Sequence, residues 1–289
     1  MARIDTRNTV RYWVDPEIAG LSCLHADFTD HAYSPHTHDG FVIAITEAGG
    51  SEFRSRGRTD EATSAALLVF NPDEPHSGRM GHSTRWRYRS LYLDPQAIAY
   101  LSRSLGMSRP VYFTRNTFRD AGLISAFLNL HETLDNGRDA LAQQDLLVSC
   151  FGTLCKEYAD GGTRIPDAPR ANSVARTVIA HMRNYYAEKL TLERMSSRVG
   201  LTPFQLISLF KRSVGLTPHA YLTQVRLKAA MRELQRGATL TEAALAVGFY
   251  DQSALNNHLK RSYGITPLQY MQSLSRRRPR DIPPDNFDQ

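Results

Sequence analysis

The hexapeptide SVGLTP at residues 213–218 returns almost unchanged as SYGITP at residues 262–267. Two further glycines keep nearly the same interval, because Gly200 corresponds to Gly248 as Gly215 corresponds to Gly264. Self-similarity at a fixed interval predicts one supersecondary unit that is present in two copies. This repeat constrains the fold more than any other feature, and it leaves most of the 289 residues for a separate domain upstream.

The first copy has the pattern of two short helices joined by a glycine turn. Thr191 is placed to cap the first helix, and Gly200 ends it with the positive φ that glycine adopts without strain. Thr202 then caps the second helix, with Pro203 at its first position. A helix, a turn and a second helix with a polar outer face form the helix-turn-helix pattern of DNA-binding proteins.

The second copy repeats this arrangement. We expect Thr241 to cap its first helix, Gly248 to turn the chain, and its second helix to begin near Asp251. Residues 218–237 between the copies read as a single helix. Such a helix spans ~28 Å, and the major groove faces one side of B-DNA every ~34 Å. The spacer therefore suits two recognition helices in neighbouring groove segments.

The charge of the chain is divided unevenly. Residues 1–169 carry a net charge of −4, whereas residues 170–280 carry +13. A region so basic attracts polyanions such as DNA. The Gly- and Pro-containing stretch 159–173 marks a linker where the sign changes. We find no long apolar run and no apolar segment at the N-terminus, so we predict a cytoplasmic protein that does not span a membrane.

The residues before the linker predict strands and then helices. The segments FVIAI (41–45), ALLVF (66–70) and YRSLYL (88–93) are typical of strands of a small barrel or sandwich. EAGGSEF (47–53) predicts a hairpin turn and NPDEPH (71–76) a tight turn. From about residue 118 the apolar spacing is helical and indicates an antiparallel helix pair. Those helices either pack on the strands or form a dimer interface.

The two copies and their spacer, from LTLERMSSRVGLTPFQLISLFKRSVGLTP to EAALAVGFYDQSALNNHLKRSYGITPLQYM, resemble the AraC/XylS family of bacterial transcription regulators. The resemblance covers about residues 174–274 and implies an α+β multidomain fold. A cupin-like β-barrel with a helical hairpin would occupy residues 1–160, bind an effector and support dimerisation. A linker at 161–172 would lead to an all-α domain at 173–276, two helix-turn-helix units joined by a long helix, and a flexible tail at 277–289.

The resemblance also implies which residues contact DNA. Base-facing positions are Phe204, Gln205, Ile207, Ser208, Gln252, Ser253, Asn256 and Asn257; we expect phosphate contacts from Lys211, Arg212, Lys260 and Arg261. The family often has arginine at the positions of Ser208 and Asn257. Arginine makes the commonest guanine contact, whereas Asn and Gln suit adenine edges and Phe or Ile suits a thymine methyl, so we predict a preference for A·T pairs at those positions. The basic segment 275–280 either contacts phosphates or stays solvated.

Three histidines stand out in the first domain. The segments PHTHDG (35–40) and NPDEPH (71–76) resemble the strand-turn segments of cupin barrels, whose metal-binding members use His-x-His, a glutamate and a distant histidine. His36, His38 and His76 match the histidines, but Val42 and Ile43 occupy the glutamate positions. The histidines therefore hold zinc or another divalent metal, hydrogen-bond a polar effector, or serve only the structure.

Further candidates for the effector pocket are Tyr33, Asn71 and Arg54, of which an arginine would suit a carboxylate. We expect no cofactor beyond the metal that the histidines leave open. The three cysteines are too few and too irregular for a disulfide framework.

These features together predict a sequence-specific DNA-binding transcription regulator, not an enzyme, that a small effector in the barrel controls. Its expected partners are double-stranded DNA, the effector, a second copy in a homodimer, and RNA polymerase if it activates transcription. The alternatives are a metal-dependent cupin enzyme tethered to a DNA-binding domain and a constitutive architectural DNA binder. The sequence has no recognisable Ser/His/Asp or Cys/His nucleophile pattern.

Overall fold

The computed structural model describes residues 8–137, 139–160, 165–167, 172–263 and 266–275. The predicted tail at 277–289 and most of the predicted linker lie outside these residues, as does nearly all of the basic segment 275–280. The chain divides into two compact units. The first contains residues 1–175 and 191–218, and the second contains residues 176–190 and 219–289. The first helix-turn-helix copy therefore packs in one unit with the N-terminal domain.

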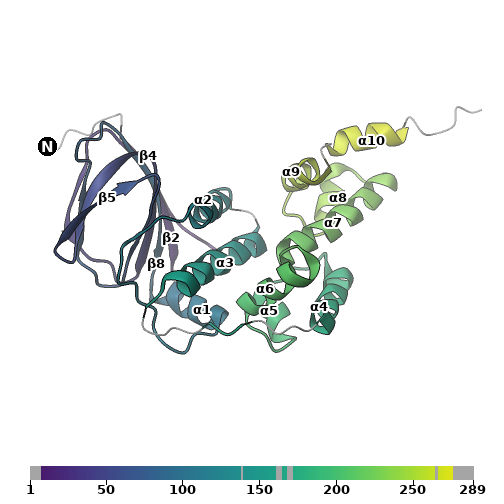
Figure 1. Ribbon diagram of the computed structural model, residues 1–289. Coiled ribbons are helices and arrows are strands. Elements are labelled where there is room, and N and C mark those ends of the chain that lie inside the picture. Colours follow the sequence, from purple (N-terminus) through teal and green to yellow (C-terminus); the bar gives the residue numbers. More distant parts are fainter. Residues whose placement is uncertain (1–7, 138, 161–164, 168–171, 264–265, 276–289) are drawn as a thin grey trace, which may run out of the picture. The chain divides into compact units, whose positions relative to one another are not determined.

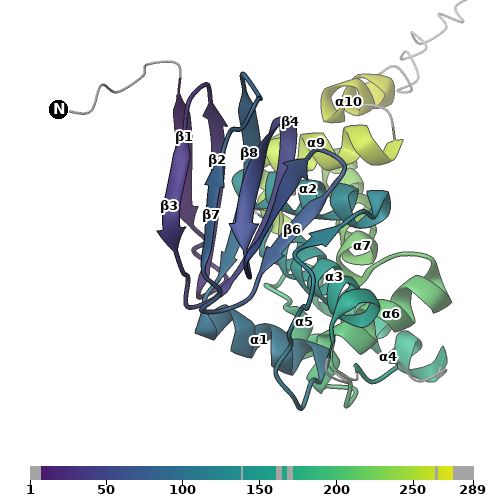
Figure 2. The same ribbon diagram turned by 60° about the vertical axis from the view of Figure 1, so that its left-hand side comes forward.

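Two antiparallel sheets that share one long strand build the N-terminal domain (Figures 1 and 2). One sheet has the order β1-β2-β8-β4-β6-β9, and in the other β3 pairs with β7, and both β7 and β5 pair with β4. The strands are β1 (Thr9–Val14), β2 (Leu21–Phe28), β3 (Ala32–His36), β4 (Phe41–Ser55), β5 (Arg58–Thr63), β6 (Leu67–Phe70), β7 (His76–Arg79), β8 (Trp86–Leu93) and β9 (Thr117–Phe118). This arrangement is the predicted cupin-like barrel.

Strand β4 passes from one sheet to the other at the glycine pair that the sequence suggested as a hairpin turn. Its first half pairs with β6 and β8, and from Gly50 onward it pairs with β5. Gly49 has a φ of 71°, and a Cβ there would lie 1.6 Å from the carbonyl oxygen of Arg85. The prediction of a turn at 47–53 was wrong, because these glycines bend one continuous strand and allow a close backbone approach.

The helices of the first unit lie behind one sheet. Helices α2 (Ala121–Asp135) and α3 (Ala140–Tyr158) form the predicted pair, and α2 packs on β4 and β8. Helix α1 (Pro95–Leu105) was not predicted, although Asp94 caps it and proline occupies its first position. Helices α5 (Leu192–Ser197) and α6 (Pro203–Val214) are the first helix-turn-helix copy, capped by Thr191 and Thr202 as predicted.

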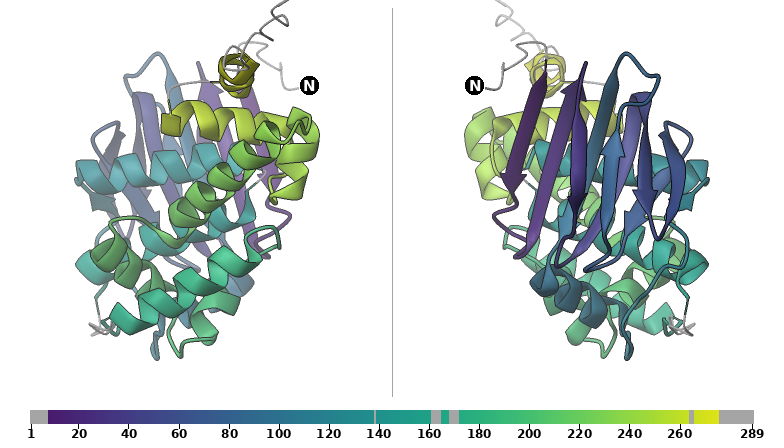
Figure 3. Two further views of the ribbon diagram at one scale, coloured as in Figure 1. Left: turned by 90° about the vertical axis from the view of Figure 1, so that its right-hand side faces the viewer. Right: turned by 90° about the vertical axis from the view of Figure 1, so that its left-hand side faces the viewer.

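The second unit is helical. It contains most of α4 (Asn172–Tyr185), then α7 (Pro218–Gln235), α8 (Leu240–Ala246), α9 (Gln252–Tyr263) and α10 (Pro267–Ser275). The spacer is one continuous helix, α7, as Figure 3 shows. The hydrophobic core of the second unit includes Leu227, Val247 and Leu255. Thr239 caps α8 in a reciprocal box with Glu242, so the prediction of Thr241 as the cap was wrong by two residues.

A buried carboxylate organises the turn between β6 and β7. Glu74 accepts hydrogen bonds at 2.5 Å from Ser55 Oγ and from Arg56 Nη2, at 2.8 Å from Asn71 Nδ2 and at 2.7 Å from Asn116 Nδ2. Burial alone would raise the pKa of Glu74, but these donors outweigh it and lower that pKa to about 2. The predicted tight turn at 71–76 is thus held by a buried charged group.

We expect the Glu74 carboxylate to make folding stability depend on acid pH. Its folded-state pKa lies below the ordinary value, so its contribution is complete above about pH 4.5 and is lost as the pH falls toward 2. The shift corresponds to a contribution on the order of 3 kcal/mol. Urea unfolding of the full chain should show Glu74→Gln well below wild type at pH 7, with a gap that narrows at pH 3. Glu61→Gln, on the exposed edge of β5, is the control; an equal gap at both pH values would contradict the assignment.

Candidate effector cavity and DNA-reading helices

The barrel contains a partly open cavity of about 170 Å³ between its two sheets. Its lining includes Val42, Phe53, Phe70, Trp86, Tyr88 and Tyr92, together with the three histidines, and none of its lining residues is Asp, Glu, Lys or Arg. Ligand sites are typically apolar clefts with a few convergent polar groups. A larger hollow of about 450 Å³ beside α1 is lined mostly by polar residues, among them Glu17, Gln96 and Arg103, and lacks the apolar and aromatic wall of the barrel cavity. We therefore take the barrel cavity as the candidate effector site.

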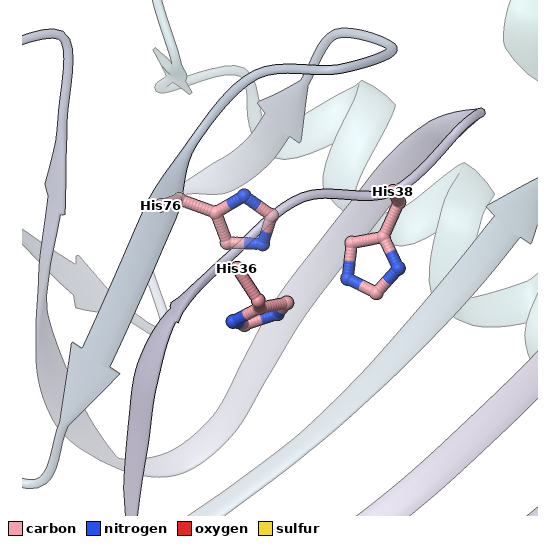
Figure 4. A group of neighbouring side chains, drawn as sticks. All are labelled: His36, His38 and His76. Atoms are coloured by element: carbon pink, nitrogen blue, oxygen red, sulfur yellow. The ribbon is translucent and has the colours of Figure 1, made fainter.

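Backbone contacts bring the three histidines together. His36 lies directly opposite His76 in the ladder between β3 and β7. The loop that carries His38 is tied to the β6–β7 turn, because the backbone N–H of Asp73 donates to the His38 carbonyl oxygen at 2.7 Å. The ring centroid of His36 lies 4.9 Å from that of His38 and 4.5 Å from that of His76. Figure 4 shows the three rings side by side.

Burial favours the neutral form of His38 and His76, and backbone contacts orient the rings of His36 and His76. The Nδ1 atoms of His36 and His76 lie 2.8 and 2.9 Å from the backbone oxygens of Ser34 and Glu74. Because a carbonyl oxygen can only accept, each Nδ1 carries the proton and each Nε2 presents its lone pair. Burial lowers the pKa of His76, although the Glu74 carbonyl opposes this, and burial followed by the proximity of His36 lowers the pKa of His38.

The other predicted effector residues divide into two groups. Tyr33 lines the cavity, and its hydroxyl lies 2.6 Å from the hydroxyl of Tyr88. Asn71 is buried outside the lining, where its amide contacts Glu74 and accepts from the backbone N–H of Phe113 at 2.9 Å. Arg54 is exposed between the buried Phe53 and Ser55, because alternate residues of a strand point to opposite faces.

Sequence reasoning missed the aromatic wall of the cavity. Phe70 stacks on the His76 ring with centroids 4.0 Å apart, and Tyr92 approaches the His38 ring at 5.3 Å. Trp86 and Tyr88 complete this wall from β8. The alternation of Trp86, Tyr88, Ser90 and Tyr92 along one strand was the available signal, since these residues share a face.

Helix α9 displays its predicted base-facing residues to solvent. Gln252, Ser253 and Asn257 are exposed, and Asn256 is half-buried. The carboxylate of Asp251 accepts from the backbone N–H of Ala254 at 2.7 Å, which starts the helix where the sequence predicted. The four predicted phosphate-contacting residues are all exposed, at the C-terminal ends of their helices: Lys211 and Arg212 on α6, and Lys260 and Arg261 on α9.

Helix α6 is different, because its equivalent face packs inside the first unit. Ile207 is buried, Ser208 is half-buried, and Phe204 lies so close to α3 that a Cβ on Gly152 would be 2.5 Å from its ring. The side chain of Gln205 accepts from the Thr202 backbone N–H at 3.0 Å. The structure therefore brings this predicted base-facing set together on α6 but buries or engages three of its four members.

Comparison with known proteins agrees with this architecture. Residues 18–150 match the AraC-like ligand binding domain, and residues 195–273 match a helix-turn-helix domain. The uncharacterized HTH-type transcriptional regulator YbfI of Bacillus subtilis (strain 168) is 26% identical over 219 residues, which cover 75% of this chain and 79% of that protein. The lactose operon transcription activator of Staphylococcus xylosus is 22% identical over 238 residues, 81% of this chain and 84% of that protein.

Among solved structures, a probable AraC family transcriptional regulator from Rhodopseudomonas palustris CGA009 is 26% identical and covers 36% of this chain and 98% of its own, with a TM-score of 0.34. A barrel with a ligand-sized cavity, followed by two helix-turn-helix units, defines a ligand-responsive DNA-binding protein. The family matches make the identification specific: the chain belongs to the AraC-type transcription regulators, with an N-terminal ligand-binding domain and a C-terminal helix-turn-helix domain.

The contact between Phe204 and Gly152 predicts that a substitution which normally stabilises a helix will here lower the folding stability. Replacing a helical glycine by leucine should stabilise a helix by roughly 1 kcal/mol, but at Gly152 the new side chain would meet Phe204 and Leu105. We expect Gly152→Leu to destabilise the chain by about 1–3 kcal/mol through overpacking. In a Phe204→Ala background this cost should fall by about 1 kcal/mol, because the two sites are coupled.

Equilibrium unfolding of the two single variants and the double variant measures this coupling. Thr153→Leu, at the exposed neighbouring position on α3, is the control and should change stability little. An identical cost of Gly152→Leu in both backgrounds would show that α6 does not pack on α3 through this ring.

Proposed function

We propose that this protein is a cytoplasmic regulator that acts as a homodimer, takes its effector into the barrel cavity, and contacts RNA polymerase where it activates transcription. The observation that carries the proposal is the pairing, in one chain, of a histidine-lined apolar cavity with a recognition helix, α9, whose polar face is exposed. A reversible effect on transcription requires the effector to bind two states of the protein unequally.

The proposed DNA contacts of α9 follow from side-chain chemistry. The amides of Gln252 and Asn257 are exposed and suit the donor and acceptor pair on an adenine edge. Lys260 and Arg261 stand one turn further along and can reach phosphates, which raise affinity without selecting sequence. We therefore propose that α9 contributes more direct base contacts than α6 in the conformation described.

The effector's influence on α6 would pass through the sheet and helices that separate them. Tyr88 and Tyr92 face the cavity from β8, whereas Leu91 and Leu93 on the same strand are buried. Helix α2 contacts β8, α3 contacts α2, and α6 contacts α3. A ligand that shifts β8 would therefore alter the surface on which α6 packs.

A metal-dependent cupin enzyme tethered to DNA is the second candidate, and only the three-histidine cluster favours it. We favour regulation, because the exposed polar face of α9 supports DNA binding and the cluster alone does not identify a substrate. The discriminating measurement is a thermal-shift screen of the full chain against small metabolites. Any stabilising compound is then followed for chemical conversion and for its effect on DNA binding. Conversion of the compound would establish the enzyme.

Substitutions on α9 should separate base reading from phosphate binding. We expect Asn257→Ala to cost about 1–3 kcal/mol at one position of the selected DNA site and to relax the base preference there. Lys260→Ala should weaken binding to all sequences alike. It should also reduce the slope of log affinity against log salt concentration by about one, because one fewer counterion is released. Site selection followed by titration at several salt concentrations measures both.

The control is Glu233→Gln, which removes a charge on α7, outside both recognition helices. If Asn257→Ala lowered the affinity for specific and random duplexes equally, α9 would not contact bases through this residue. A selected site dominated by G·C pairs would contradict the expected preference for A·T pairs.

A further inference from the structure

The three histidines of the barrel present their ligand atoms to one another. One ring nitrogen from each of His36, His38 and His76 lies within 4.8 Å of the other two. The Nε2 atoms of His36 and His76 are set as lone-pair donors, because backbone oxygens occupy both Nδ1 atoms. Histidines that bind metals characteristically have the second nitrogen held by such a carbonyl or carboxylate. The outer contacts of a metal site are therefore already made for two of the three histidines, His36 and His76.

We propose that His36, His38 and His76 bind one divalent transition metal ion of the zinc class, and that the effector is a small organic anion that completes its coordination. The second half of this inference rests on the proposed function of the cavity as the effector site, whereas the first half does not.

The geometry requires only side-chain adjustment. Three nitrogens at 2.0–2.1 Å from a tetrahedral ion lie about 3.4 Å apart. The present separations are within 4.8 Å, and the His36 and His76 rings stand on paired strands whose backbones need not move. Binding would then require the side chains to rotate so that the three nitrogens approach from within 4.8 Å to that spacing. Three imidazoles without a thiolate favour Zn²⁺, Ni²⁺, Co²⁺ or Cu²⁺ over Mg²⁺ or Ca²⁺.

No described residue that lines the cavity carries a carboxylate, and Asp39, next to His38 in the sequence, is exposed and outside the lining. Val42 occupies the cavity wall, and the nearest buried carboxylate, Glu74, already accepts from Arg56, Asn71 and Asn116. Three neutral imidazoles leave the ion with its full double charge in a cavity whose lining has no ionisable carboxylate or cation. An uncompensated charge in apolar surroundings is costly, so an anionic ligand in the fourth position is strongly favoured.

The cavity also describes the rest of that ligand. Its volume, about 170 Å³, resembles that of an apolar cavity able to hold one benzene ring. Phe70, Trp86 and Tyr92 offer faces for stacking. The indole N–H of Trp86, one of the lining residues, is buried without a hydrogen-bond partner among the described residues. These features fit a single-ring carboxylate.

The metal is tested first, on the full chain after chelation, by titration with Co²⁺ and Zn²⁺. We expect one equivalent of Co²⁺ with the visible absorption of a four-coordinate ion, and its displacement by Zn²⁺. His76→Ala and His38→Asn should each weaken binding by more than about 100-fold, the upper range for changes to groups that only support a ligand. His82→Ala, an exposed histidine outside the cavity, should bind as wild type.

Unchanged Co²⁺ affinity in both His76→Ala and His38→Asn, or no Co²⁺ binding by folded wild type, would overturn the proposed metal site. Circular dichroism identifies a variant that has merely unfolded, and His38→Asn keeps a polar side chain of similar size for that reason.

The anion is tested next with benzoate as the probe and benzyl alcohol as its neutral counterpart. We expect benzoate to change the Co²⁺ spectrum and to stabilise the metal-loaded protein, with at least tenfold weaker binding to the chelated protein and no spectral effect of benzyl alcohol. Benzoate binding that is equal with and without metal would overturn the anion's coordination while leaving the metal site and the proposed regulator intact. Loss of DNA binding by wild type under every condition would instead defeat the proposed function.

Discussion

The candidate effector site depends on one buried carboxylate. The side chain of Glu74 joins the β6–β7 turn to Arg56 at the β4–β5 turn and to Asn116. A carboxylate taken out of water must be compensated by donors, so these contacts are obligatory once the turn is buried. The backbone oxygen of the same residue holds the Nδ1 atom of His76. Because His36 pairs with His76 across the ladder, the conformation of this turn determines how the histidines meet.

The sequence predicted those parts of the protein that depend on local chemistry. The repeat, the caps at Thr191 and Thr202, the proline-rich turn at 71–76 and the continuous spacer helix all follow from residues within a few positions of one another. His36, His38 and His76 were also found, because their resemblance to a known pattern is local. Thr239 was missed in favour of Thr241, although Glu242 three residues later is the stronger capping signal.

Long-range packing decided the features that the sequence did not reveal. The glycines at 49 and 50 resemble a turn, and only the approach of Arg85 shows that they bend a strand between two sheets. The sequence likewise places Phe204 and Ile207 on the outer face of a recognition helix. Nothing local predicts that α3 will cover that face, because the partner surface lies about fifty residues away in the chain. The exposed position of Arg54, by contrast, was readable from the alternation of β4.

The flat surface that Gly152 gives to α3 makes the two possible neighbours of Phe204 mutually exclusive. A phenyl ring cannot rest on a helix of the ligand-binding domain and enter a major groove at the same moment. A DNA duplex that binds this ring must first displace it from α3. Because of linkage, each of the two contacts weakens the other by the same free energy. Binding of Phe204 to DNA would then remove its contact with α3. A bound promoter would in this way affect the ligand-binding domain, just as a bound effector would affect the DNA-binding helices.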